Sequence, residues 1–155
     1  MPDKTEAVVI IKAAPQVGFR HGETVCCAGI DLYGRWLRLY PVSFRTLEEA
    51  QKFGRWDRIR FDWRKPTDDP RPESVRVNQQ SIEVVGELRP SEREKFLTNC
   101  IVESLAHERE AGRSLALLKV QILEFRYEKK NEEEVKLETT KFDALRAQPD
   151  LLANR

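Results

Sequence analysis

The sequence predicts a mainly β protein of the α+β class: a small, curled antiparallel barrel with one long packed helix and one short inserted helix. Two kinds of spacing support this prediction. Apolar residues recur at every second position in 35–42 and 57–65, as in half-buried strands, and at every third or fourth position in 91–111, as in a helix. An OB-like barrel is the leading candidate, and an SH3-like or PUA-like barrel is the alternative.

The first strands are expected close to the N-terminus. Residues 7–13 (AVVIIKA) are apolar and rich in β-branched side chains, which indicates a buried strand. Residues 24–30 and 35–42 follow as two further strands. The turn signal of Asp31 and Gly34 between them predicts an antiparallel hairpin.

The second strand of this hairpin carries a distinctive pattern. Because side chains alternate along a strand, Leu37 and Leu39 face one way and Trp36, Arg38 and Tyr40 the other. The leucine face belongs to a core. The other face is aromatic and cationic, which is typical of a stacking platform for nucleic-acid bases, although outer faces of barrels also carry aromatic residues for packing.

The middle of the chain is expected to contain a short helix and a strand. A helix over 46–53 is favoured because Thr46 can cap it, Glu49 can complete a capping box and Gly54 can end it. Residues 57–65 (DRIRFDWRK) then alternate between apolar and charged side chains. This alternation predicts a half-buried strand with a basic outer face.

The second half of the chain is expected to add two short strands, the long helix and a last strand. The short strands are 74–78 and 82–85, and the helix over 91–111 ends at Gly112. The last strand, 117–127, is expected to contain a bulge because its apolar phase slips. The single core predicted from these patterns consists of Leu37, Leu39, Ile59, Phe61, Trp63, Val75, Val77, Phe96, Ile101 and Leu105.

Length and charge limit the possible functions. The chain has 155 residues, which fits one domain, expected over 1–130 and followed by an acidic, weakly structured tail over 131–155. The 27 Lys and Arg against 26 Asp and Glu leave a net charge of +1, so attraction to polyanions must come from local patterns. No apolar run approaches the roughly 18–20 residues of a membrane span, so a cytoplasmic protein without a membrane partner is expected.

No metal, other cofactor or catalytic residue is expected. The three cysteines lack the spacing of a zinc site, and no base stands close enough in the pattern to indicate a nucleophilic thiol. Carboxylates surround strand 57–65, so a metal-dependent nuclease is the second alternative function: they are Asp57, Asp62, Asp68, Asp69 and Glu73. Asp62 and Lys65 would point to opposite faces of a strand, which argues against a nuclease.

The hairpin region resembles a known pattern. Residues 25–30 (VCCAGI) followed by 34–42 (GRWLRLYPV) resemble a C-x-A-G-I strand leading into G-x-W-hydrophobic-R in uncharacterised bacterial proteins. Some of these proteins are described as dual OB-fold proteins. The resemblance implies an OB fold over the first half of the chain and supplies no catalytic residue.

The outer faces of the predicted strands indicate a function. Arginine can pair with phosphate and stack on bases, and with aromatic side chains it forms the surface of single-strand-binding proteins. We therefore expect a non-catalytic module that binds single-stranded or distorted nucleic acid and acts with other proteins. The alternative is a protein-interaction subunit that uses the Trp36/Tyr40 face. The candidate binding residues are Trp36, Arg38, Tyr40, Arg58, Arg60, Arg64 and Arg76.

Overall fold

The computed structural model describes residues 3–13, 16–18, 22–43 and 47–146. The chain divides into two compact units, Met1–Lys119 and Val120–Arg155, and each is described by itself. The described helices fall short of the length and apolarity that a membrane span requires. The predicted boundary between a domain over 1–130 and a tail over 131–155 stays a prediction.

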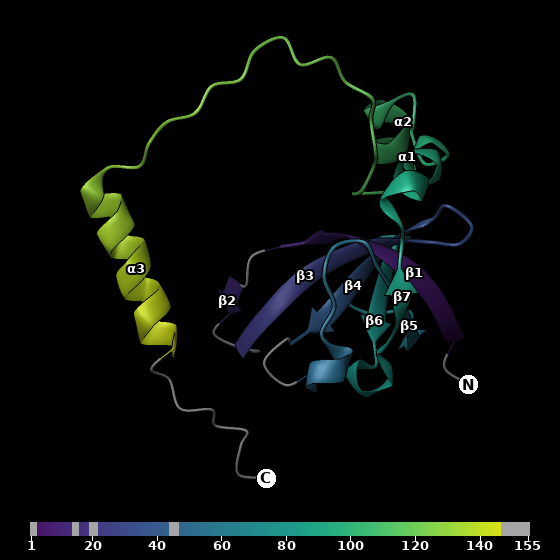
Figure 1. Ribbon diagram of the computed structural model, residues 1–155, viewed down its shortest axis with the longest axis horizontal. Helices are drawn as coiled ribbons and strands as arrows, with labels where there is room; N and C mark the ends of the chain where they lie inside the picture. The colour runs from purple at the N-terminus through teal and green to yellow at the C-terminus, as the bar shows by residue number, and fades with distance from the viewer. Residues whose placement is uncertain (1–2, 14–15, 19–21, 44–46, 147–155) are drawn as a thin grey trace. The chain divides into compact units, whose positions relative to one another are not determined.

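Five strands of the first unit close into a barrel (Figure 1). In spatial order the strands are β1 (Asp3–Lys12), β3 (Gly22–Asp31), β4 (Trp36–Val42), β6 (Ser74–Val77) and β5 (Asp57–Arg64). The pairing of β5 with β1 closes the ring. Two more strands, β2 (Gln16–Gly18) and β7 (Glu83–Glu87), pair with β3 and β5. The predicted fold class, a small OB-like barrel, is confirmed, with β4–β6 as a parallel pair among antiparallel ones.

The barrel is filled by the residues that alternate inward. Leu37, Leu39, Ile59 and Phe61 are all buried there, as predicted, and Trp63 packs partly buried against them. The predicted hairpin also forms, with β3 and β4 antiparallel.

Strand β1 is buried on both faces, and Gly29 allows it to lie close to β3. Ala7 and Val9 belong to the barrel core, whereas Val8 and Ile10 belong to a second cluster on the outer face. At Gly29 a Cβ atom would stand 2.7 Å from the backbone oxygen of Val8, so only glycine fits between the two strands without a shift.

Phe96 and Leu97 of α1 (Pro90–Thr98) pack against the second cluster, so the apolar core is divided in two. Phe96 packs in this second cluster and not in the barrel. The prediction of a single core was wrong for Ile101 and Leu105, which are 38% and 55% exposed. Both residues lie beyond the end of α1, where the helical spacing no longer applies.

The predicted long helix is two short ones, α1 and α2 (Leu105–Glu110). Ile101 and Val102 lie between them, and the Val102 N–H donates to the Leu117 carbonyl at 2.9 Å. β-Branched residues favour such extended pairing, and it competes with continuation of the helix. Ser104 then caps α2, so the prediction of one continuous helix over 91–111 was wrong.

The inserted helix is a single 3-10 turn, η1 (Glu49–Gln51), with Glu48 at its N-cap. The predicted cap, Thr46, lies outside the described residues. The Gln51 side chain fixes this turn to a second one, η2 (Gln79–Ser81), by donating to backbone carbonyls including that of Gln79 at 3.3 Å. The turn η1 is therefore anchored to η2, which follows the C-terminal end of β6.

The predicted last strand over 117–127 is wrong. Leu117 makes one bridge to Ile101, and no further strand pairing is described between 118 and 127. A strand needs a neighbour for its backbone hydrogen bonds, and no strand is paired with this segment among the described residues. Its large apolar side chains are exposed: Val120, Ile122, Leu123, Phe125 and Tyr127.

The second unit contains α3 (Glu132–Arg146), in a segment where the sequence analysis placed no element. Asn131 and Glu134 form a reciprocal cap at its start: the Glu134 N–H donates to Asn131 Oδ1 at 2.9 Å, and the Asn131 N–H to Glu134 Oε2 at 3.1 Å. This capping box in the sequence NEEE was the signal that could have predicted the helix.

Candidate functional site

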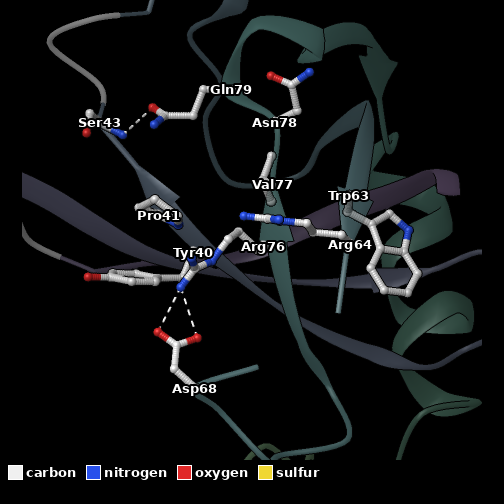
Figure 2. Close-up of a pocket in the computed structure, with 10 residues that line it drawn as sticks. All are labelled: Tyr40, Pro41, Ser43, Trp63, Arg64, Asp68, Arg76, Val77, Asn78 and Gln79. Carbon is white, nitrogen blue, oxygen red and sulfur yellow. Dashed lines mark hydrogen bonds and ion pairs between the residues drawn. The ribbon is translucent and has the colours of Figure 1, made fainter. Parts of the chain in front are cut away.

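One row of residues crosses three neighbouring strands of the barrel. Tyr40 on β4 pairs in register with Arg76 on β6, and Arg76 pairs with Arg64 on β5. Residues paired across strands point to the same face of a sheet. The row therefore places one aromatic ring and two guanidinium groups side by side on the outer surface of the barrel (Figure 2).

Two adjoining pockets flank this row. The larger, of about 660 Å³, lies where β4, β5 and β6 end, and Trp63, Gln79 and the row itself contribute to its wall (Figure 2). The smaller, of about 330 Å³, lies between β3–β4 and the β5–β6 loop (65–73). Both volumes fall within the range that ligand pockets occupy. The pockets share Tyr40, Asp68 and Arg76, and together we call them the groove.

The groove carries uncompensated positive charge. Arg76 is paired with Asp68, but Arg64 has no acidic partner in the described part of the chain. Like charges directly opposite one another on a sheet are destabilising. Arg64 therefore adds a positive charge directly opposite the Arg76–Asp68 ion pair, and an anion bound between the two arginines would compensate it.

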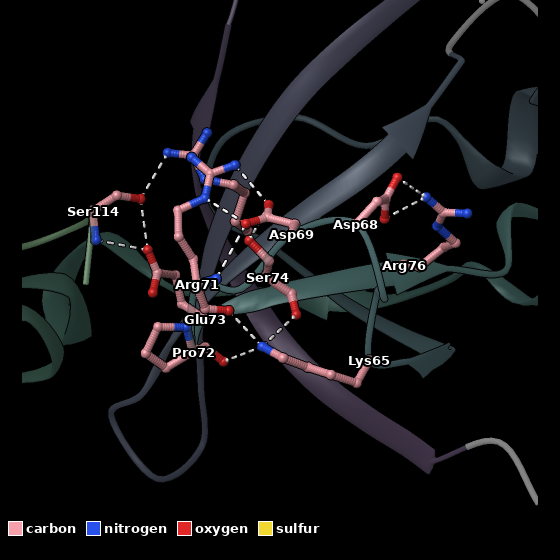
Figure 3. Close-up of polar contacts among 10 residues, drawn as sticks. Lys65, Asp68, Asp69, Arg71, Pro72, Glu73, Ser74, Arg76 and Ser114 are labelled. Atoms are coloured by element: carbon pink, nitrogen blue, oxygen red, sulfur yellow. Dashed lines mark hydrogen bonds and ion pairs between the residues drawn. The ribbon is translucent and has the colours of Figure 1, made fainter. Parts of the chain in front are cut away.

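A further cationic group, Arg38, is positioned by a hydrogen-bond relay through the exposed Ser114 to the buried Glu73. Figure 3 shows the Ser114–Glu73 part of this relay. Arg38 Nη2 donates to Ser114 Oγ at 3.0 Å, and that hydroxyl donates to Glu73 Oε1 at 2.6 Å. Burial alone would raise the pKa of Glu73, but the hydrogen bonds from Ser114 and the charge of Arg38 hold it below its ordinary value. Glu73 thus stays ionised and orients Arg38 through Ser114 towards the smaller pocket.

The β5–β6 loop is held by its own ion pair and by a lysine. Asp69 accepts from Arg71 and from Ser74, and the hydrogen bond from Arg71 lowers the pKa of Asp69 well below its ordinary value (Figure 3). The Lys65 ammonium donates to the carbonyls of Pro72 and Ser74 at 3.0 and 3.3 Å. These contacts fix the wall of the smaller pocket.

The structure brings together four of the seven predicted binding residues: Arg38, Tyr40, Arg64 and Arg76. Trp36 lies on the same strand face but packs against the second cluster, beneath α1. Trp36 and Tyr40 therefore do not share one open surface.

The two remaining predicted arginines, Arg58 and Arg60, share a carboxylate outside the groove. Arg58 Nε donates to Glu6 Oε1 at 2.9 Å, and Arg60 Nη2 donates to Glu6 Oε2 at 3.3 Å. The Glu6 side chain is only 12% exposed, and the hydrogen bond from Arg58 is the main cause that lowers its pKa. Glu6 thus neutralises much of the positive charge on this part of β5.

The groove residues that the predicted binding set omitted include Cys26, Asp68 and Arg71. The loop KPTDDPRPES between two confident strands was the available signal for Asp68 and Arg71, since binding residues concentrate in loops on rigid scaffolds. Cys26 is the outward-facing member of an adjacent pair, which alternation could have shown.

The thiols and carboxylates form no reactive cluster that the structure describes. Burial raises the pKa of Cys27 to about 12 and also raises the pKa of Cys100. No group of three or more metal-ligating side chains is present among the described residues. The carboxylates of Asp68, Asp69 and Glu73 are each engaged by the partners given above.

The fold and the groove define the first unit as an OB-like barrel with a cationic, partly aromatic groove on its outer face. Residues 3–101 match the family described as "Domain of unknown function (DUF8758)", and the chain belongs to this family. The match covers the whole barrel and α1, including the row of Tyr40, Arg76 and Arg64. The comparisons with curated proteins and with solved structures found no match.

Proposed function

We propose that this protein is a cytoplasmic, non-catalytic nucleic-acid-binding module that binds single-stranded or distorted nucleic acid in the groove and acts with other proteins. The row of Tyr40, Arg76 and Arg64 is the observation that supports this function. Its ring offers a surface for an unpaired base, and its guanidinium groups offer donors for the adjoining phosphates.

The position and charge of the groove support the same proposal. In OB folds the face of the second and third barrel strands, with the loop between the fourth and fifth, is where oligonucleotides and oligosaccharides bind. The groove lies on that face and beside that loop here. Four arginines against two aspartates give it a charge of about +2, whereas the whole chain carries +1: Arg38, Arg64, Arg71 and Arg76 against Asp68 and Asp69. A polyanion is therefore the favoured ligand over a neutral saccharide.

Arg64→Gln is expected to weaken binding of single-stranded nucleic acid and to reduce the slope of log K against log salt by about 0.7, the mark of one lost phosphate contact. The matched control is Arg60→Gln, on the same strand and face but held by Glu6. It should change neither value. Fluorescence anisotropy with labelled single-stranded DNA, RNA and duplex across a salt series measures both.

Equal effects of Arg64→Gln and Arg60→Gln would show that affinity depends on the total charge of the protein and not on contacts in the groove. Binding that is absent at every salt concentration would overturn the proposed function and leave protein interaction as the remaining candidate. The exposed apolar side chains between Val120 and Tyr127 favour that candidate, because such a stretch is typical of interaction sites.

Tyr40→Ala is expected to weaken single-strand binding by about 1–3 kcal/mol, the contribution of one stacked base. Tyr33→Ala is the control, because Tyr33 is an exposed tyrosine in the β3–β4 turn, outside both pockets. It should leave binding unchanged. A loss of affinity in Tyr33→Ala as large as in Tyr40→Ala would place the stacking surface elsewhere.

A further inference from the structure

The two pockets of the groove meet at an ion pair. Asp68 and Arg76 line both pockets, and Arg76 Nη2 donates to both carboxylate oxygens of Asp68, at 2.9 and 2.8 Å (Figure 2). Asp68 comes from the β5–β6 loop and is 66% exposed, whereas the Arg76 side chain is 35% exposed and is fixed in a barrel strand. The carboxylate is thus the more easily displaced partner.

Arg76 retains unused capacity for an anion. Its Nε is buried and has no hydrogen-bond partner among the described residues, and the same is true of Arg38 Nε. A guanidinium binds a phosphate best through two parallel N–H groups. Asp68 uses Nη2 alone, so a better-matched anion at this point would gain a hydrogen bond that the free protein lacks.

We infer that the Asp68 carboxylate occupies the position of a linking phosphate, which replaces it on Arg76 when nucleic acid binds. This inference rests on the proposed function. A carboxylate and a phosphodiester both carry one negative charge and present oxygen acceptors, so Arg76 exchanges one for the other. The unpaired Arg64 directly opposite Arg76 attracts the incoming phosphate, while Asp68 moves into water.

The position of the ion pair also defines the ligand class. Because Arg76 lies where the two pockets adjoin, a phosphate there has space on both sides. The ligand is therefore at least two linked nucleotides, with one nucleotide towards each pocket and Tyr40 available for stacking. An oligonucleotide of this kind lies in the groove, along the row of Tyr40, Arg76 and Arg64.

The test is Asp68→Asn, measured by fluorescence anisotropy with a short labelled oligothymidylate. Removal of the competing charge is expected to lower Kd about threefold to fivefold, the upper range for an exposed ion pair. Glu83→Gln is the matched control. Glu83 Oε2 lies 3.6 Å from Arg60 Nη1, and this ion pair is outside the groove, so the substitution also removes one carboxylate from an arginine. It should leave Kd unchanged.

Two further measurements identify the phosphate as the competitor. In an Arg76→Gln background, Asp68→Asn should no longer tighten binding, as a double-mutant cycle requires of a shared partner. With a methylphosphonate-linked oligothymidylate, whose linkages are neutral, Asp68→Asn should also give no tightening. Thermal denaturation of every variant checks that the fold is retained.

The inference is overturned if Asp68→Asn leaves Kd unchanged, weakens binding, tightens it only as much as Glu83→Gln, or still tightens it without Arg76. If the unaltered protein binds the oligonucleotide in any of these cases, the proposed function stands and only the phosphate position is wrong. If neither the unaltered protein nor Asp68→Asn binds at the lowest salt concentration, both proposals fail.

Discussion

Replacing Phe61 with alanine is expected to lower the free energy of unfolding by about 3–5 kcal/mol. Phe61 is fully buried in the barrel core and lies on β5 opposite Thr5 of β1, at the pairing that closes the barrel. Removal of its ring leaves a cavity between strands that are fixed on both sides, so the surroundings cannot collapse to fill it. Urea denaturation followed by circular dichroism measures the change.

The control for this substitution is Phe125→Ala, because Phe125 is exposed and lies outside the barrel unit. It is expected to change the free energy of unfolding by less than about 0.5 kcal/mol. An unchanged urea midpoint for Phe61→Ala would contradict the register of β5 against β1.

Glu73→Ala is expected to destabilise the first unit by about 2–3 kcal/mol, because hydrogen bonds to a buried charged group contribute more than neutral ones. Glu73 Oε1 accepts from the Ser114 N–H at 2.7 Å and from its hydroxyl at 2.6 Å, which fixes the segment after α2 to the barrel. Alanine leaves both donors without this acceptor. Urea denaturation at neutral pH measures the loss.

The pH dependence of stability supplies a second readout for Glu73. Its pKa is lowered from 4.5 on folding, so its stabilisation is fully present above pH 4.5 and is lost as the pH falls through the lower folded value. Glu73→Gln should therefore flatten the decline of stability below pH 4.5. Glu103→Ala, which removes an exposed carboxylate, is the control and should leave the free energy of unfolding at neutral pH unchanged. An acid profile identical in Glu73→Gln and the unaltered protein would contradict the assigned role.

The strands of the barrel could be predicted because alternation is a local property. On β4 and β5 the buried positions alternate as the apolar residues do in the sequence, and Leu37, Leu39, Ile59 and Phe61 lie inside the barrel. Apolar residues also alternate in 117–127, yet this segment forms no strand. A strand must pair with a neighbouring strand, and alternation within one segment does not show whether such a neighbour exists. The break between α1 and α2 has the same origin, since Ile101 forms a β-bridge with the distant Leu117, in which the Val102 N–H donates to the Leu117 carbonyl.

The candidate site could be predicted only in part, because charge compensation is a tertiary property. Arg60 and Arg64 lie on the same face of β5 and look alike in the sequence. Glu6, more than fifty positions away from Arg60, pairs with it through the β1–β5 contact, whereas none of the described acidic side chains pairs with Arg64. Trp36 and Tyr40 also differ in their surroundings. Trp36 packs in the cluster under α1 at one end of β4, whereas Tyr40 lines the groove at the other end.

One of the two adjacent thiols of β3 offers a natural site for attaching a fluorescent label. Cys26 is exposed and lines the smaller pocket, whereas Cys27 and Cys100 are buried, and burial raises the pKa of each of these two. Because a maleimide dye must reach the sulfur atom that it modifies, it attaches to the exposed Cys26 in preference to the two buried thiols. The natural sequence thereby carries a fluorophore attachment point at the groove wall, and occupancy of the groove becomes visible without a single substitution.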